Sequence, residues 1–348
     1  MEKNIWGKDT DGRDITIYTL QNSKGMSVRT MDYGANVLSI CVPDSQGNTA
    51  DVVLGFESLE DYFVNDAFFG CCVVPSCNRI GKAQFTLNGK TYLLDKNDGE
   101  NNLHGGSFQI CRCIWEVTDV SDASITFSYH KKDGEMRFPG NMDISVTYTV
   151  TEENELRIDY LGLSDADTIF NPTNHSYFHL GGQGSGDVLD HVLWLNASFF
   201  TMTDPASIPD GTLVNVADTP MDFTTPKPIG RDIDSDYEPL LWAGGYDHNF
   251  VIDKTEGELA LAASVHDPKS GRYLEVFTDR PGIQVYCGNY ISSDDIGKGK
   301  IPYGARYGLA LETQYYPNAI NIASFPQPVA KAHVPSRSTT IYKFSNRA

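Results

Sequence analysis

The stretch TNHSYFHLGG, from Thr173 to Gly182, gathers side chains that can donate, accept or stack. His175 and His179 are four residues apart, which is the spacing of zinc ligands on a helix. However, Pro172 precedes them and a Gly pair follows, so the segment is predicted to be extended. Four residues of a strand span roughly 13 Å, whereas a Zn–N bond is about 2 Å long. We therefore expect no zinc site from this pair.

Two interpretations of His175 remain, a hydrogen-bonded core histidine and a catalytic one. Its neighbours Asn174, Ser176 and Tyr177 carry polar tips that are costly to bury without partners. Aromatic faces beside hydrogen-bonding tips also match a sugar ring, which has C–H faces and hydroxyls. The surroundings therefore favour a catalytic His175 in a sugar-binding pocket.

Four other segments carry side chains that could share such a site. His104, in DGENNLHGG, is either a solvated loop histidine or a site residue. Glu312 lies in the apolar run LALETQ, where it is either an ion-pair partner or a base whose pKa burial has raised. Arg79, which follows Asn78, and Asp247, which follows a Gly pair, are by default surface charges. These segments alone do not decide between the alternatives.

The charge balance restricts the partners. The 348 residues include 27 Lys and Arg against 46 Asp and Glu, a formal net charge of −19. Such a field repels nucleic acid and anionic lipid, so we expect neither as a partner. A neutral small molecule is the best fit.

The sequence also predicts a cytoplasmic protein. No apolar run is long enough to cross a bilayer, and the polar N-terminus lacks the apolar region of a secretory signal. The seven Cys include no C-x-x-C pair, which favours reduced core thiols over a disulfide framework or a metal site.

The elements that must position these residues are mostly strands. DISVTYTV (143–150) alternates Ile144, Val146, Tyr148 and Val150 with Ser and Thr, and SITFSYH repeats the pattern. Asn88-Gly89 between alternating segments predicts a two-residue hairpin with a type I′ turn. Only residues 57–66 suggest a helix, and a short one. Many short strands separated by turn dipeptides predict an all-β sandwich or barrel, with residues 1–348 as one domain.

Seven segments in this order resemble the galactose mutarotase (aldose 1-epimerase) family. They are NRIGKAQFTLNGKTYLL, NNLHGG, TNHSYFHLGG, IPDGTLVNVADTPMDF, GGYDHNF, PGIQVYCGN and LALETQYYPNAIN. The resemblance implies a large antiparallel β supersandwich. It also implies an isomerase that needs no cofactor or metal and interconverts the α and β anomers of a free hexose such as galactose or glucose.

The same resemblance assigns roles to residues. Glu312 would be the general base and His175 the general acid, with His104 as a second catalytic histidine near the ring oxygen. Asn78, Arg79, Tyr177, Asp247 and Gln284 match positions that contact sugar hydroxyls. Opening a pyranose requires loss of the proton on the C1 hydroxyl and delivery of one to the ring oxygen. We therefore expect Glu312 to be ionised while His175 is protonated.

Some features depart from the family pattern or leave alternatives open. His179, Pro172 and Cys77 differ from the residues usual in the family, which leaves the preferred aldose open because His179 and Cys77 adjoin matched site residues. The rival functions are a glycoside-cleaving enzyme on the same scaffold, a non-catalytic sugar-binding module and a phosphosugar epimerase. The chain is expected to be a monomer or a homodimer.

Overall fold

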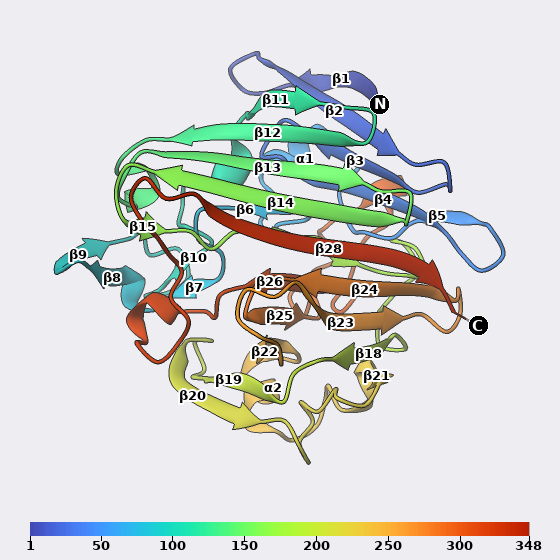
Figure 1. Cartoon of the computed structure of the whole chain (residues 1–348). Helices are drawn as coiled ribbons and strands as arrows, with labels where there is room; N and C mark the ends of the chain where they lie inside the picture. Colours follow the sequence, from blue (N-terminus) through green and yellow to red (C-terminus); the bar gives the residue numbers. More distant parts are fainter. Residues whose placement is uncertain (348) are drawn as a thin grey trace.

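The computed structural model describes residues 1–347, and antiparallel strands dominate it (Figure 1). The largest sheet has nine strands in the order β11-β12-β13-β14-β28-β24-β23-β18-β21. They are β11 (Glu116–Val120), β12 (Ser124–Lys131), β13 (Met142–Val150), β14 (Glu155–Ser164), β28 (Ser336–Asn346), β24 (Arg272–Thr278), β23 (Ala260–His266), β18 (Val192–Leu195) and β21 (Lys227–Pro228). The all-β prediction is confirmed.

Two further sheets complete the main framework. One has five strands in chain order: β1 (Glu2–Lys8), β2 (Asp14–Gln21), β3 (Ser27–Met31), β4 (Val37–Pro43) and β5 (Thr49–Asp51). The other has six strands in the order β17-β26-β25-β22-β19-β20. These are β17 (Tyr177–Phe178), β26 (Leu309–Gln314), β25 (Gly282–Tyr286), β22 (Asp247–Val251), β19 (Phe199–Thr203) and β20 (Pro209–Asn215).

The core lies between the nine-stranded sheet and the other two. In β13 the predicted inward residues Ile144, Val146, Tyr148 and Val150 are all buried. Burying each such side chain contributes roughly 1.5–3 kcal/mol. Two tyrosine hydroxyls link the layers: Tyr148 donates to the Ala35 carbonyl at 2.6 Å, and Tyr342 of β28 donates to the Leu311 carbonyl of β26 at 2.9 Å.

The local features predicted from the sequence are also found. Strands β8 (Gln84–Leu87) and β9 (Lys90–Leu93) form the hairpin, and φ is +51° at Asn88 and +77° at Gly89, as a type I′ turn requires. The short helix is α1 (Leu59–Phe63), which Ser58 caps. The sequence analysis did not anticipate α2 (Glu238–Ala243). Among residues 1–347, no helix is long and apolar enough to cross a membrane.

Short strands at one end of the six-stranded sheet hold the candidate residues. Strand β16 (Thr173–His175) pairs with β6 (Cys71–Val73), and β17 pairs with β26. Strand β7 (Arg79–Ile80) pairs with β10 (Asn102–Leu103), immediately before His104. Segments that are far apart in the sequence therefore meet at one place.

Candidate active site

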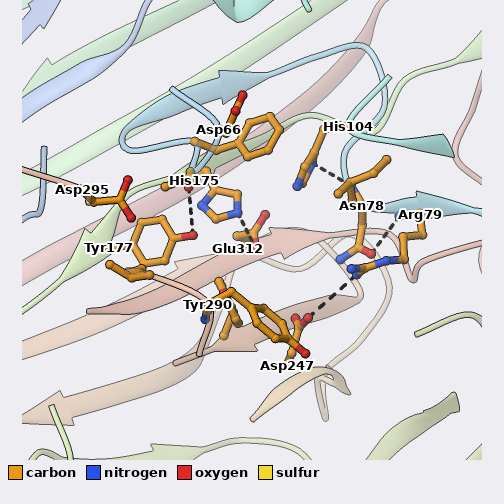
Figure 2. Close-up of a pocket in the computed structure, with 15 residues that line it drawn as sticks. Asp66, Asn78, Arg79, His104, His175, Tyr177, Asp247, Tyr290, Asp295 and Glu312 are labelled. Atoms are coloured by element: carbon orange, nitrogen blue, oxygen red, sulfur yellow. Dashed lines mark hydrogen bonds and ion pairs between the residues drawn. The ribbon is translucent and has the colours of Figure 1, made fainter. Parts of the chain in front are cut away.

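A cavity of about 310 Å³ lies where these short strands meet the six-stranded sheet (Figure 2). That volume is at the lower end of the range usual for small-molecule sites. Seven of the eight predicted site residues line it: Asn78, Arg79, His104, His175, Tyr177, Asp247 and Glu312. The structure therefore brings together side chains from five separate segments of the sequence.

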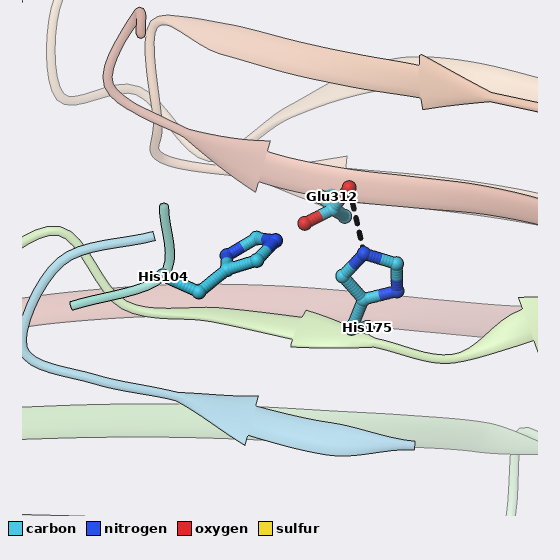
Figure 3. A group of neighbouring side chains, drawn as sticks. All are labelled: His104, His175 and Glu312. Atoms are coloured by element: carbon cyan, nitrogen blue, oxygen red, sulfur yellow. Dashed lines mark ion pairs between the residues drawn. The ribbon is translucent and has the colours of Figure 1, made fainter. Parts of the chain in front are cut away.

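His175 and Glu312 come from different strands and meet inside the cavity (Figure 3). The Nε2 atom of His175 lies 3.5 Å from Oε1 of Glu312, and both side chains are almost fully buried. The backbone of β16 is held by Gly70, whose N–H donates to the His175 carbonyl at 3.1 Å. The pair is therefore set by strand pairing and not by a flexible loop.

Cross-strand register brings the other groups of the sheet to the same face. Glu312 of β26 lies opposite Gln284 of β25, and Tyr286 of β25 lies opposite Asp247 of β22. Directly opposed residues, and those two apart on a strand, share a face. Glu312, Tyr286 and Asp247 accordingly all line the cavity.

His104 is held in one tautomer by a reciprocal pair of backbone contacts. The backbone N–H of His104 donates to the Asn78 carbonyl at 3.1 Å, and the ring Nδ1 of His104 accepts the backbone N–H of Asn78 at 3.1 Å. Burial, with His175 and Arg79 nearby, lowers the pKa of His104 well below its usual value, so the ring is neutral. Because Nδ1 is an acceptor, the proton is on Nε2. His104 is thus a buried hydrogen-bond donor, and the solvated-loop interpretation is wrong.

A connected set of charged and polar side chains surrounds Arg79 and Asp247. Arg79 Nε donates to Asp98 at 2.8 Å, and its Nη1 lies 3.9 Å from the Asp247 carboxylate. Gln284 donates from Nε2 to Asp247 at 2.7 Å. Arg79 and Asp247 are only 16% and 12% exposed in their side chains, so the default of a solvated surface charge is wrong for both.

The electrostatics of the central pair differ from the sequence-based expectation. Burial raises the pKa of Glu312 well above its usual value; Asp247 raises it further, against the lowering effect of Arg79. Burial lowers the pKa of His175 to about 4. At 3.5 Å the two would attract if charged, but Nδ1 of His175 and Oε2 of Glu312 have no hydrogen-bond partner among the described residues. Lost hydration therefore outweighs the attraction, and burial favours the neutral form of both groups.

Three residues from the segments predicted to form the site do not line this cavity. Gln284 does not line the cavity but supports Asp247 from within the sheet. His179 lies in a separate cavity, where its ring packs against His191 with centroids 4.8 Å apart. Asn174 donates to the Gly70 carbonyl at 3.3 Å and so braces the backbone. Successive residues of a strand point to opposite faces, which is why His175 and Tyr177 reach the cavity and Asn174 does not.

Five aromatic and acidic residues that line the cavity were not predicted from the sequence. Phe68, Tyr286 and Tyr290 line the cavity, and so do Asp66 and Asp295. Tyr286 had a usable signal, since it follows Gln284 by two residues in a predicted strand. The other four lie on turns whose positions depend on distant contacts.

Comparison with known proteins now decides the family. Residues 16–343 match the aldose 1-epimerase family. The sequence is 37% identical to a galactose mutarotase from Bos taurus over 328 residues, which cover 94% of this chain and 93% of the relative. It is 38% identical to an aldose 1-epimerase from Haemophilus influenzae, over 89% of each chain. The chain belongs to the aldose 1-epimerase family.

Solved structures agree with this assignment. An aldose epimerase homologue from C. elegans superimposes with a TM-score of 0.88 at 28% identity, covering 95% of this chain and 99% of the other. A galactose 1-epimerase from Lactobacillus acidophilus gives 0.87 at 27% identity over the full length of both. This aldose 1-epimerase is therefore an isomerase with the mutarotase-type fold that the sequence predicted.

One geometric feature of this epimerase resembles a metal centre. Ligand atoms of His104, His175 and Glu312 all lie within 4.8 Å of one another. A His₂Glu set with an open position suits catalytic zinc. However, a metal ligand must offer a lone pair, and the Nε2 atom of His104 carries a proton because Nδ1 accepts the Asn78 N–H. The set fits proton transfer better than metal binding.

Proposed function

We propose that this aldose 1-epimerase interconverts the α and β anomers of a free aldohexose, with Glu312 and His175 as the proton-transfer pair. The observation that carries the proposal is their 3.5 Å approach inside a cavity that also holds the His104 donor. The names of the relatives from Bos taurus and Haemophilus influenzae support an aldose, with galactose as the first candidate.

The mechanism depends on one proton shared by the pair. With Glu312 ionised and His175 protonated, Glu312 removes the C1 hydroxyl proton while His175 protonates the ring oxygen. The C1–O5 bond breaks and the aldehyde forms, leaving Glu312 protonated and His175 neutral. Rotation about C1–C2 exposes the other carbonyl face, and the two transfers run in reverse. The neutral forms that burial favours therefore match the protonation of the pair facing the open-chain sugar.

The remaining groups would hold the sugar. The Nε2–H of His104 can donate to the ring oxygen or an adjacent hydroxyl without changing its own charge. Arg79 and Asp247 offer a donor and an acceptor to ring hydroxyls, and Asn78 and Tyr177 line the wall between. Gln284 acts through Asp247. Such orientation keeps the reacting atoms aligned.

The rival functions fit less well. Glycoside cleavage needs one carboxyl that donates a proton and a second free carboxylate, whereas Asp247 is engaged by Gln284 and Arg79. A sugar-binding module has no need of a Glu/His pair. A phosphosugar would meet Asp66 and Asp295 at the entrance, and the cationic Arg79 is already shared by two Asp.

The domain, location and assembly stay predictions with structural support of different kinds. The nine-stranded sheet takes strands from residue 116 to residue 346 and shares its core with the other two sheets, which supports one domain over residues 1–348. All seven Cys are free, which supports a reducing compartment such as the cytoplasm. The chain is proposed to act as a monomer or a homodimer.

Polarimetry tests the function. Freshly dissolved α-D-galactose and, separately, α-D-glucose are followed with the wild type, His175→Asn and Glu312→Gln. The wild type is expected to speed the decay of rotation well beyond the buffer rate. Each variant should lose at least about 10²-fold in kcat, because each removes a proton-transfer group while keeping a similar shape. Glu312→Gln should still bind sugar in a calorimetric titration. Normal turnover by either variant would falsify the assigned roles.

A further inference from the structure

Phe68 contacts both histidines of the cavity. Its ring centroid lies 4.7 Å from that of His104 and 5.8 Å from that of His175, in the second case nearly parallel at 29°. The two imidazoles themselves are 5.4 Å apart, at 78°. Among the described aromatic side chains, only Phe68 packs against both rings. It therefore forms the third member of a three-ring cluster.

The backbone at Phe68 is strained. Its φ is +60°, a left-handed conformation that is rare for a bulky side chain. The turn is held in place from both sides: Tyr177 donates from its hydroxyl to the Ala67 carbonyl at 2.9 Å, and Cys71 N–H donates to the Phe68 carbonyl at 3.1 Å. Nothing local to the turn requires Phe there, whereas Gly would adopt the same backbone without strain.

We propose that Phe68 is a positioning residue, whose ring fixes the orientation of the His104 and His175 imidazoles and excludes water from their outer side. The Phe68 ring packs against both imidazoles, so a change in the orientation of either one would disturb this contact. The strained turn is the conformation that places the ring across both. Phe68 thus acts through the two histidines and takes no part in proton transfer itself. The effect of Phe68 on kcat rests on the proposed function, whereas its effect on the protonation of His104 and His175 does not.

Removing the ring should alter the protonation of both imidazoles. The titratable and charged groups that line the cavity with them are Glu312 on β26, Asp247 on β22, Tyr286 on β25, Tyr177 on β17, Arg79 on β7, and Asp66, Tyr290 and Asp295 on connecting segments. All of these would remain in a Phe68 variant. The change would therefore be in hydration, and water beside the imidazoles favours their charged form.

The first experiment measures the imidazoles directly, without sugar. Histidine Cε1 resonances are titrated by NMR in the wild type and in Phe68→Gly, with His175→Asn used for assignment. The His175 midpoint should be near 4 in the wild type and rise by roughly 1 unit or more in the variant. His179 and His191 lie in the other cavity and should not move. Unchanged midpoints at both His104 and His175 would overturn the proposal.

The second experiment separates positioning from stability. Phe68→Gly relieves the strained φ but loses the packing of the ring against the Cys71, Cys77 and Cys111 cluster, so its thermal midpoint is measured first. At a temperature where the variant is fully folded, kcat should fall about tenfold or more. Phe68→Tyr, which restores a ring, should recover most of the kcat. His333→Gly is the matched control, since His333 also has a positive φ (+62°) but is exposed outside the cavity, and its kcat should be unchanged.

The kinetic outcomes are distinct from a failure of the proposed function. A wild type without activity on any aldose would contradict the function, and the NMR titration would still decide the role of Phe68. An active wild type with kcat of Phe68→Gly within twofold would overturn the positioning role. A rise in KM with an unchanged kcat would also overturn the positioning role, because it would show that the ring contributes only to sugar binding. If Phe68→Gly does not fold, Phe68→Leu takes its place with the same expected direction in kcat.

Discussion

At the level of single residues, the same burial acts oppositely on the pKa values of Glu312 and His175, the two members of the proposed proton-transfer pair. It raises the pKa of Glu312 and lowers that of His175 to about 4, because each is driven toward its neutral form. Between these two titrations the pair holds one proton. That single-proton state is the one the proposed reaction needs, whichever partner carries the proton at a given step.

The pH dependence of the reaction follows from this state. Below about pH 4 His175 is protonated while Glu312 keeps its proton, so no base remains and activity falls. Above the raised pKa of Glu312 the pair loses its proton, so no acid remains. We expect a bell-shaped profile of kcat/KM with its acid limb near pH 4, not near the usual histidine value of about 6.5. The measurement is polarimetry from pH 3.5 to 9 with the buffer rate subtracted at each pH. An acid limb close to 6.5, or no alkaline limb at all, would contradict the shared-proton account.

Residue types could be predicted from the sequence, but not their electrostatic state. Glu312 in an apolar run already suggested a buried carboxyl, and the structure confirms its burial. The tautomer of His104 depends on the Asn78 N–H, a contact between two segments whose approach only the fold determines. The role proposed for Phe68 likewise had no signal, because the irregular segment NDAFFG (65–70) shows no periodic pattern.

At the level of elements, alternation and turn chemistry predicted most of the strands. Strand β13 and the Asn88-Gly89 hairpin are local features, so local sequence sufficed. Which strands pair is a non-local property. The pairing of β16 with β6, and the register that places Gln284 opposite Glu312, had no signal in the sequence. The same strand pairing brings Gln284 within hydrogen-bonding distance of Asp247 on β22, at 2.7 Å.

Gly70 offers a test of how strand pairing positions the site. Its φ is +69°, and a Cβ there would overlap the Val37 carbonyl, while its N–H holds the His175 carbonyl at 3.1 Å. Gly70→Ala is therefore expected to cost about 3 kcal/mol or more in the free energy of unfolding, and to lower kcat about tenfold or more by displacing His175. Urea unfolding and polarimetry on the same preparation measure both.

Gly89→Ala is the matched control for that variant. Gly89 also has a positive φ, of +77°, but a Cβ there meets nothing within 4 Å. Only the backbone strain of about 1 kcal/mol is expected, with kcat unchanged. Equal losses of stability in the two variants, or a normal kcat in Gly70→Ala, would show that the contact between Gly70 and β16 does not position His175.

At the level of the whole molecule, the fold buries an unusual set of neutral histidines. Burial lowers the pKa of five: His104, His175, His179, His191 and His248. Only two of them lie in the active-site cavity. His191 instead accepts the Leu180 N–H at 2.9 Å, within the same segment, Thr173 to Gly182, that carries His175. Neutral imidazoles are thus part of the structural framework as well as of the site.

This set predicts how stability depends on pH. Each histidine binds a proton more readily in the unfolded chain, where its pKa is about 6.5, than in the folded protein, where His175 and His248 titrate at about 4 and His191 at about 3. Their contribution is therefore fully present above about pH 6.5 and is lost as pH falls toward the folded-state values. Each adds up to about 1.4 kcal/mol per pH unit to the slope of the unfolding free energy in that window. Urea unfolding at intervals between pH 7 and pH 4.5 measures this slope.

Two variants, His191→Gln and His333→Gln, isolate the contribution of the buried His191. His191→Gln keeps a side-chain acceptor for the Leu180 N–H but cannot take up a proton, so its slope between pH 6 and pH 4.5 should be smaller by up to about 1.4 kcal/mol per pH unit. At pH 7 the variant is expected to have a lower free energy of unfolding than the wild type. The difference between the two should narrow as pH falls. His333→Gln changes an exposed histidine and should leave the slope as it is. Parallel curves for His191→Gln and the wild type would mean that His191 takes up its proton in the folded protein, and that its place beside Leu180 tolerates the charge.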